Sequence, residues 1–444
     1  MPNPVRKNGR LNSLASRRPF IPWALYDWGG SAFPAVVSTF VIAPYVTQSL
    51  APDPVSGQVQ WGWMQALVGL GVALLAPILG ALADANGRQR GMLAAFTLLS
   101  VVATAALWRA EPDHSWLLYA LACVAVASLS FEIATSFYNA ALPDVAAPDR
   151  LGRASAFAWG LGYLGGLACL GLALALLVMP EPAPFGLDRD AAEPVRATAL
   201  LVAAWMLAFA LPALVLLPGR PPSGLTWRAA TARGLGRLNE VVQSLPARPD
   251  VGRLLLARLF YTDGLNTFSI FAAVYAAGVF GMEFERMLLF GIVMNGSAGL
   301  GCFAVGLVED RIGARRVIVL ALAGIVTLGI PLLATGQEAW FWALAVVIAF
   351  LFGAPQSASR TLMAHVAPPG DRAACFGLLA LSGRATGFIG PAMVATVTMA
   401  TESQSLGIAT TLVFMAVGGL ILACGAQGRA GRLREHAGAR SGPA

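Results

Sequence analysis

The chain has 444 residues, is 57% hydrophobic and 12% charged, and carries a formal net charge of +7 at pH 7. That composition excludes a soluble globular domain and predicts an all-α membrane protein whose soluble parts are short loops and two tails. The basic excess does not predict nucleic-acid binding, because the arginines fall mainly in the connections between apolar runs.

Twelve apolar runs are long enough to cross a bilayer, whose hydrocarbon core needs about 20 residues per helix. Each run is bounded by charge, proline or glycine, which indicates where a helix begins and ends. In chain order the predicted spans cover residues 21–49, 61–83, 91–108, 116–142, 154–179, 196–217, 252–279, 287–308, 317–335, 339–361, 373–399 and 405–425.

The Lys and Arg residues orient these spans. With a cytoplasmic N-terminus, 24 of the 30 lie on the cytoplasmic side and four lie outside, at positions 109, 189, 196 and 286. The positive-inside rule therefore predicts that both termini are cytoplasmic. A cleaved signal peptide is a poor alternative for the first span, because the basic leader precedes a carboxylate-bearing helix far longer than a signal sequence.

The longest predicted cytoplasmic connection divides the spans into two halves of six. The predicted organisation is a basic N-tail over 1–20, a six-helix bundle over 21–218, a linker over 219–251, a second six-helix bundle over 252–426 and a basic C-tail over 427–444. We expect a pseudo-symmetric 6+6 arrangement, because the halves share sequence motifs.

The clearest repeated motif lies between the second and third spans of each half. It reads GALADANGRQR over 80–90 and GLVEDRIGARR over 306–316, with two glycines and an aspartate repeated at an offset of 226 residues. Weaker repeats pair RASAF (153–157) with RAACF (372–376) and GYLGG (162–166) with GFIGP (387–391).

The residue types of this motif suit a tight cytoplasmic turn for physical reasons. Glycines permit a tight reversal and close helix approach, and a carboxylate can accept from arginines or from the free amides at a neighbouring helix start. Such contacts can hold one conformation and break in another, so the gating candidates here are Asp84, Arg88, Asp310 and Arg315. The alternative is a charged loop that only sets topology.

A duplicated loop motif of this form on a 6+6 membrane protein resembles the major facilitator superfamily. Further segments, namely WALYDWGGSAF, FYNAALPDVA, AFAWGLGYLGG, RLFYTDGLNTF and GRATGFIGP, resemble its autophagy-related vacuolar effluxer branch and the bacterial relatives of that branch. The resemblance implies a secondary transporter, with amino-acid efflux in vacuolar members. Gly29 and Gly30 depart from the Ala-Asn of the branch, and Asp144 from its Glu.

Five charges lie inside the predicted spans: Asp27, Glu132, Arg258, Asp263 and Arg384. A charge at a helix centre costs roughly 2.5 to 3.5 kcal/mol on insertion scales, so these groups must face protein, water or each other. Polar residues at helical spacing mark the first, fourth, seventh and tenth spans, which by the resemblance line a central cavity. The binding candidates on these stripes include Asn139, Asn266, Gln356 and Arg360.

The predicted distance from the cytoplasmic face assigns different roles to the charges inside the spans. At 1.5 Å per residue, Glu132, Asp263 and Arg384 lie roughly 15 to 17 Å from the cytoplasmic face, near the midplane where transporter sites are found. We expect the two carboxylates to bind a proton or other ion, and Arg384 to bind a substrate carboxylate or act as countercharge. The alternative is a permanently paired structural network.

Asp27 lies only about 9 Å from the same face. That depth favours a gate, in which Asp27 pairs with a cation when the cytoplasmic mouth closes. Arg258 lies at a similar depth, and its side chain is expected to reach the interface.

The sequence therefore predicts a transporter of a small solute by alternating access, driven by a proton gradient, with no cofactor and no metal site. The expected partners are a small-molecule substrate, a coupling ion and the lipid bilayer, and the chain is expected to be a monomer in a bacterial inner membrane. An enzyme is disfavoured, because it would need a nucleophile and base, and no G-x-S-x-G motif, paired histidines or metal-ligand spacing falls within a span. A sensor or lipid-moving protein on the same fold is the alternative.

Overall fold

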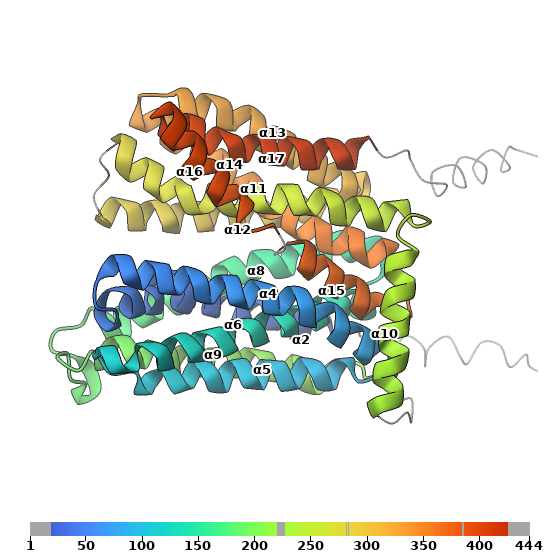
Figure 1. The fold of residues 1–444 in the computed structure, drawn as a ribbon, viewed down its shortest axis with the longest axis horizontal. Helices are drawn as coiled ribbons and strands as arrows, with labels where there is room; N and C mark the ends of the chain where they lie inside the picture. Colours follow the sequence, from blue (N-terminus) through green and yellow to red (C-terminus); the bar gives the residue numbers. More distant parts are fainter. Residues whose placement is uncertain (1–18, 220–226, 281, 283, 384–385, 425–444) are drawn as a thin grey trace, which may run out of the picture.

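A computed structural model describes residues 19–219, 227–280, 282, 284–383 and 386–424. All regular elements in these residues are helical, and none is a strand. The helices form two bundles that lie side by side, one from the earlier and one from the later part of the chain (Figure 1).

The N-terminal bundle begins with α2 (Phe20–Gly30), which continues through a π-helical segment, η2 (Phe33–Phe40), α3 (Ile42–Tyr45) and a second π-helical segment, η3 (Val46–Leu50). Its other helices are α4 (Pro54–Asn86), α5 (Gln89–Ala106), α6 (Leu117–Ala140), the short α7 (Leu142–Val145), α8 (Leu151–Ala173) with its π-helical extension η7 (Leu174–Val178), and α9 (Glu193–Leu216). Single 3₁₀ turns, η4 (Leu107–Arg109), η5 (His114–Trp116), η6 (Pro148–Arg150) and η8 (Pro184–Gly186), lie in the connections.

The polar helix α10 (Trp227–Gln243) crosses one end of the molecule between the bundles (Figure 1). The C-terminal bundle consists of α11 (Pro249–Phe280), α12 (Phe284–Ile312), α13 (Ala314–Ala334), α14 (Glu338–Val366), α15 (Arg372–Ser382), α16 (Ile389–Thr401) and α17 (Gln404–Ala423). We call the end that carries α10 the α10 end.

Ten helices in the described residues are long and apolar enough to cross a membrane. They correspond to ten of the twelve predicted spans. The predicted seventh span, 252–279, is the continuous helix α11, which carries Asp250, Arg253, Arg258 and Asp263 in its first half and is not among the ten.

The prediction of one helix over 373–399 is wrong. Two shorter apolar helices, α15 and α16, occupy this stretch, and Gly383 and Thr386–Phe388 between them are in turns. A buried carboxylate, Asp263, accepts from the Gly390 N–H at 2.9 Å in the first turn of α16. A helix start needs such an acceptor for its free amides, so Asp263 stabilises the break.

The α10 end is where the bundles share a hydrophobic core. One buried cluster there includes Trp23, Tyr138 and Leu151 from the N-terminal bundle together with Met363 and Phe376 from the C-terminal bundle. Away from this end, a second cluster consists of buried residues of the N-terminal bundle and a third of the C-terminal bundle. The bundles are therefore joined mainly at the α10 end.

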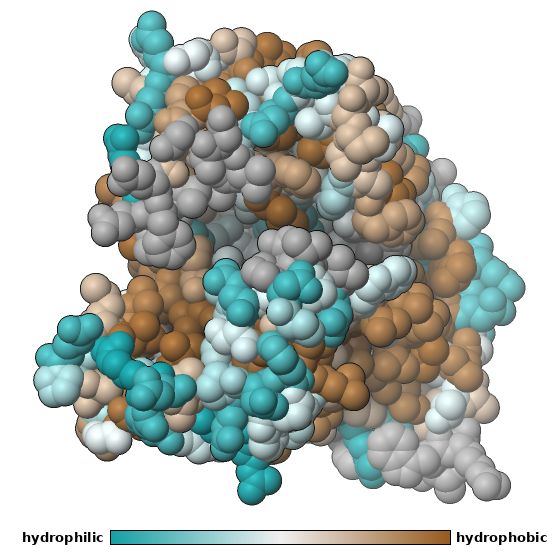
Figure 2. All heavy atoms as spheres, turned by 60° about the vertical axis from the view of Figure 1, so that its left-hand side comes forward, coloured by the Kyte–Doolittle hydropathy of each residue, from teal (hydrophilic) through white to brown (hydrophobic). Residues whose placement is uncertain are grey.

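The two helices α15 and α16 also differ in whether they pack on the opposite bundle or on their own. At the α10 end, α15 packs along α4 of the other bundle, whereas α16 packs on α17 of its own bundle. Figure 2 turns the opposite end toward the viewer and shows a recess between the upper and lower parts of the molecule.

Candidate functional site

Arg360 on α14 joins the two bundles through its guanidinium group. The Nη1 atom donates to Asp27 Oδ2 and to Asn139 Oδ1, both at 3.1 Å. The Nε atom donates to Ser155 Oγ at 2.9 Å, and Nη2 to the Ser155 carbonyl oxygen at 2.6 Å. The Arg360 side chain is 2% exposed, so a single buried cation is held by α2, α6 and α8.

Aromatic rings complete this Arg360 cluster. The guanidinium carbon lies 4.9 Å from the ring centre of Trp23, 5.6 Å from Tyr138 and 5.2 Å from Trp159. Tyr138 also donates its hydroxyl to Asp27 Oδ2 at 3.0 Å. A guanidinium group that lies over aromatic faces and is hydrogen bonded at its edges can be buried without being left unpaired.

Small residues let α2 bring Asp27 into this position. A Cβ atom on Gly29 would lie 2.6 Å from Phe209 Cβ, and one on Gly162 would lie 2.6 Å from Ser31 Oγ. Glycine at these two positions permits the close approach of α2 to α9 and α8. The WGG and GYLGG stretches of the sequence are therefore packing sites that position the carboxylate.

The repeated loop motifs form a second set of contacts between the bundles. Asp84, at the end of α4, accepts from the Ala374 N–H at 3.0 Å, and Asp310, at the end of α12, accepts from the Arg153 N–H at 3.2 Å. Ala374 and Arg153 are each the third residue of their helix, α15 and α8. Each carboxylate thus caps a helix start of the other bundle, where the helix dipole favours negative charge.

The motif glycines make this capping possible. Gly306 on α12 lies against Ala156 of α8, where a Cβ would lie 2.8 Å from the alanine Cβ, and Gly80 on α4 meets the backbone of Ala373 in the same way. Gly313 has a φ of 89°, a turn conformation that other residues rarely adopt. We call Asp84 and Asp310 the latch carboxylates.

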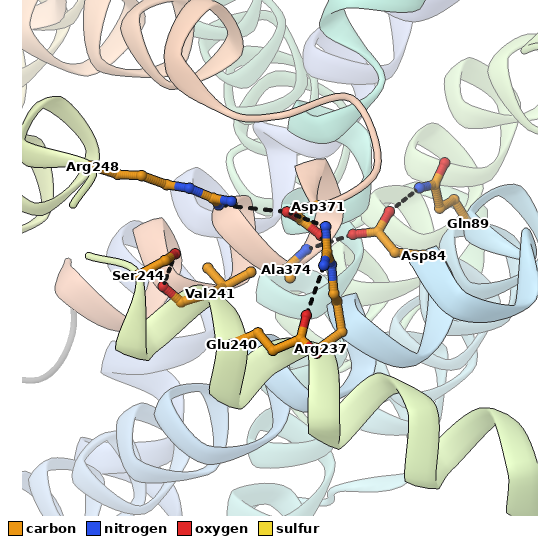
Figure 3. A network of polar contacts seen from close by, with 9 residues as sticks. All are labelled: Asp84, Gln89, Arg237, Glu240, Val241, Ser244, Arg248, Asp371 and Ala374. Carbon is orange, nitrogen blue, oxygen red and sulfur yellow. Dashed lines mark hydrogen bonds and ion pairs between the residues drawn. The ribbon is translucent and has the colours of Figure 1, made fainter. Parts of the chain in front are cut away.

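A third contact joins α10 to the start of α15 (Figure 3). Asp371 is fully buried, and Arg237 donates to its two oxygens at 2.6 and 3.2 Å, while Arg248 lies 3.5 Å away. The hydrogen bond to Asp371 raises the pKa of Arg237 above its ordinary value. We call these three residues the Asp371 clamp; it connects the linker helix to the C-terminal bundle, while Gly234 of α10 packs on the backbone of α4.

Of the three predicted midplane charges, the structure describes Glu132 and Asp263. Asp263 caps α16, as described above, and also accepts from Thr267 at 3.4 Å. Glu132 is partly buried on α6, about 10 Å along the helix from Asn139. Arg384 lies outside the described residues. Gln356 is partly buried and Asn266 is exposed.

The remaining gating candidates, Arg88 and Arg315, lie at the starts of α5 and α13 at the α10 end. Arg88 is exposed at the start of α5. Arg315 donates to the Leu422 and Ala423 carbonyl oxygens at 2.7 and 3.3 Å, so these bonds connect α13 to α17 within one bundle. The latch carboxylates, by contrast, contact the opposite bundle.

Several contacts of the site were not found from the sequence. Arg360 was predicted as a binding candidate on the tenth span, but not as the partner of Asp27, and the structure buries it within α14. Ser155 and Asp371 lie in or beside the repeated RASAF and RAACF segments, which would have marked both regions. No sequence signal links Arg237 of the linker to Asp371.

Comparisons with known proteins agree with this fold. A family profile described as "Vacuole effluxer Atg22 like" matches residues 63–432. The chain belongs to this family. The uncharacterized MFS-type transporter YxiO of Bacillus subtilis is 24% identical over 90% of this chain and 93% of its own length. Autophagy-related protein 22 of Cryptococcus neoformans is 26% identical over 60% of this chain, a match that spans about half (51%) of the fungal protein.

Solved structures show the same fold as this Atg22-like chain. The human organic anion transporter MFSD10 superposes with a TM-score of 0.69 at 19% identity, covering 91% of this chain and 99% of that one. The fucose transporter FucP in its outward conformation gives 0.71 at 12% identity, covering 91% and 98%. The chain therefore has the major facilitator fold, and its relatives support a membrane transporter.

Proposed function

We propose that the protein moves a small solute across the membrane by alternating access, as a secondary transporter driven by a proton gradient. The observation that carries this proposal is the Arg360 cluster, in which a buried cation of one bundle is held by a carboxylate, an amide and a hydroxyl of the other. Such a contact is either made or broken, and two discrete arrangements are what a rocking mechanism requires. Asp27 and Arg360 are then the gate.

The α10 end is the cytoplasmic side in this proposal. Both tails and the linker over 219–251 then lie in the cytoplasm, and twelve spans form two bundles over 21–218 and 252–426. The shared core, the latch carboxylates and the Asp371 clamp keep the cytoplasmic side closed. In this proposal the protein works as a monomer in a bacterial inner membrane, and the arrangement described above is its state closed toward the cytoplasm.

The midplane residues form the substrate and ion site in this mechanism. Glu132 and Asp263 exchange the coupling proton, and Arg384 holds an anionic group of the substrate. Asn139, Asn266 and Gln356 contribute hydrogen bonds on the cavity helices. The first substrates to examine are amino acids and related metabolites, because the chain belongs to an effluxer family.

The test is transport by the purified protein in liposomes. Labelled amino acids are offered with and without an imposed proton gradient, and we expect flux that follows the gradient. Replacement of both Glu132→Gln and Asp263→Asn should abolish the dependence on the gradient. Transport with unchanged proton dependence in that double variant would reject the coupling role, and lipid exchange without solute flux would favour a lipid-moving protein.

A further inference from the structure

Glu309 is a buried carboxylate that the mechanism above does not use. It is the residue before the latch carboxylate Asp310, near the end of α12, and it is 1% exposed. The same position of the first motif holds Ala83, which is also fully buried. The repeat therefore places a second carboxylate at one of the two latches.

Glu309 and Asp310 lie together over the start of α8. A Cβ atom on Gly152 would lie 2.7 Å from Glu309 Cγ and 2.8 Å from Asp310 Oδ1. Asp310 accepts a hydrogen bond from the backbone N–H of Arg153. Glu309 has no hydrogen-bond partner on either carboxylate oxygen among the described residues. Its polar neighbour Thr361 donates its own hydroxyl to the Ser357 carbonyl oxygen.

Two arginines near Glu309, Arg360 and Arg153, contact other groups. Arg360 is bound to Asp27, Asn139 and Ser155, as described above, and Arg153 lies 3.9 Å from Asp310 with half of its side chain exposed. At the α10 end of the elements packed around Glu309, the charged and titratable groups are Arg153 on α8, Asp310 and Arg311 on α12, Arg315 and Arg316 on α13, and Arg360 and His365 on α14. An ionised carboxylate buried without a partner is strongly disfavoured.

We propose that Glu309 is a proton-binding site that controls opening of the α10 end. With the bundles closed, the site between α8, α12 and α14 holds Glu309 in its protonated form. When the bundles separate, water reaches the carboxyl group and the proton leaves. This inference rests on the proposed rocking of the bundles, but it adds a site outside the midplane residues.

The sign of the pH effect follows from proton linkage. The closed state binds one more proton than the open state, so low pH stabilises the closed state and rising pH favours the open one. Between the pH at which the open state loses this proton and the higher pH at which the closed state loses it, the ratio of closed to open molecules falls about tenfold per pH unit. A glutamine at this position is neutral in both states and removes the dependence.

The test measures the distance between the bundles without any substrate. Spin labels are placed at Arg150→Cys, whose side chain is 71% exposed, and at Gly370→Cys, where a Cβ meets no atom within 4 Å. Cys123 and Cys424, which are not fully buried, are replaced by Ser. Distance distributions are then recorded for the full chain in lipid nanodiscs across a pH series.

We expect the longer distance to gain population as the pH rises in the protein with native Glu309. Glu309→Gln and Glu309→Leu should keep the shorter distance at every pH, while the exposed control Glu181→Gln should follow the parent. A flat profile in the parent, or a pH-dependent profile in either folded Glu309 variant, would overturn the proposal. Failure to transport amino acids would leave this measurement valid, because no solute is present.

Discussion

Arg360 shows how one side chain connects two bundles. Its guanidinium group contacts three helices of the opposite bundle and is almost completely buried. Removal of a single partner of a buried ion pair leaves an uncompensated charge, which costs roughly 3 to 5 kcal/mol in buried sites. Here the cost is smaller, because Asp27 is 18% exposed and Asn139 and Ser155 still accept from the arginine.

Asp27→Asn tests the gate at this scale. The variant keeps an acceptor of the same size but removes the charge, so the closed state loses stability while the midplane residues are unchanged. We expect turnover to fall by about tenfold, equivalent to roughly 1.4 kcal/mol, with substrate affinity nearly unchanged. Transport rates in liposomes over a series of substrate concentrations separate the two quantities. A large loss of affinity at normal turnover would place Asp27 in the binding site instead.

The residue scale also shows what the sequence could predict. The depth and charge of Asp27 led to the prediction of a cationic partner, but they did not identify Arg360, because the two residues are 333 positions apart. Helical periodicity places a side chain on a face of its own helix and contains no information on the opposite bundle. Asp263 was recognised as buried, whereas the helix break that it caps was not.

At the scale of elements, the latch carboxylates act on helix starts. Asp84→Asn and Asp310→Asn each weaken a charge-assisted cap, which is worth roughly 0.5 to 2 kcal/mol. We expect each variant to increase the open fraction at the α10 end, and the double variant to show the sum of the two effects, since the caps lie on different helix pairs. Distance measurements between labelled bundles report this fraction. An effect of only one replacement would show that the two latches are not equivalent.

The Asp371 clamp offers a comparison between two arginines. Arg237 makes two hydrogen bonds to Asp371, whereas Arg248 lies at 3.5 Å and its Nη1 atom makes no hydrogen bond to the described residues. Arg237→Gln should therefore lower the thermal stability of the purified protein clearly, and the matched control Arg248→Gln only slightly. The reverse order would mean that charge alone, and not the paired geometry, holds α10 in place.

The break between α15 and α16 is the element that the sequence analysis predicted incorrectly. The apolar composition of 373–399 is that of one membrane helix, and composition does not record where a helix start finds its acceptor. Asp263 on α11 supplies that acceptor, as Asp84 does for α15. Both halves of the broken helix are thus capped by carboxylates from other helices.

At the scale of the whole molecule, the fold was largely predictable. The apolar runs and the repeated motifs predicted an all-helical membrane protein of the major facilitator type, and the family match confirms it. The state of the molecule could not be predicted, because a core shared at one end depends on contacts between distant segments. A chain that can close at either end contains the residues of both interfaces, so the sequence does not indicate which end is closed.

A disulfide across the α10 end tests whether the bundles must separate there. Ala156 on α8 and Gly306 on α12 belong to different bundles, and their Cβ positions would be 2.8 Å apart. A disulfide needs about 3.8 Å between Cβ atoms, so the helices must move apart by about 1 Å for the Ala156→Cys and Gly306→Cys pair to form one. We expect the oxidised pair to stop transport completely and reducing agent to restore it, while each single cysteine variant transports under both conditions. Full transport by a protein whose cross-link is verified by mass spectrometry would mean that α8 and α12 stay together during the cycle, and the rocking mechanism proposed here would then be wrong.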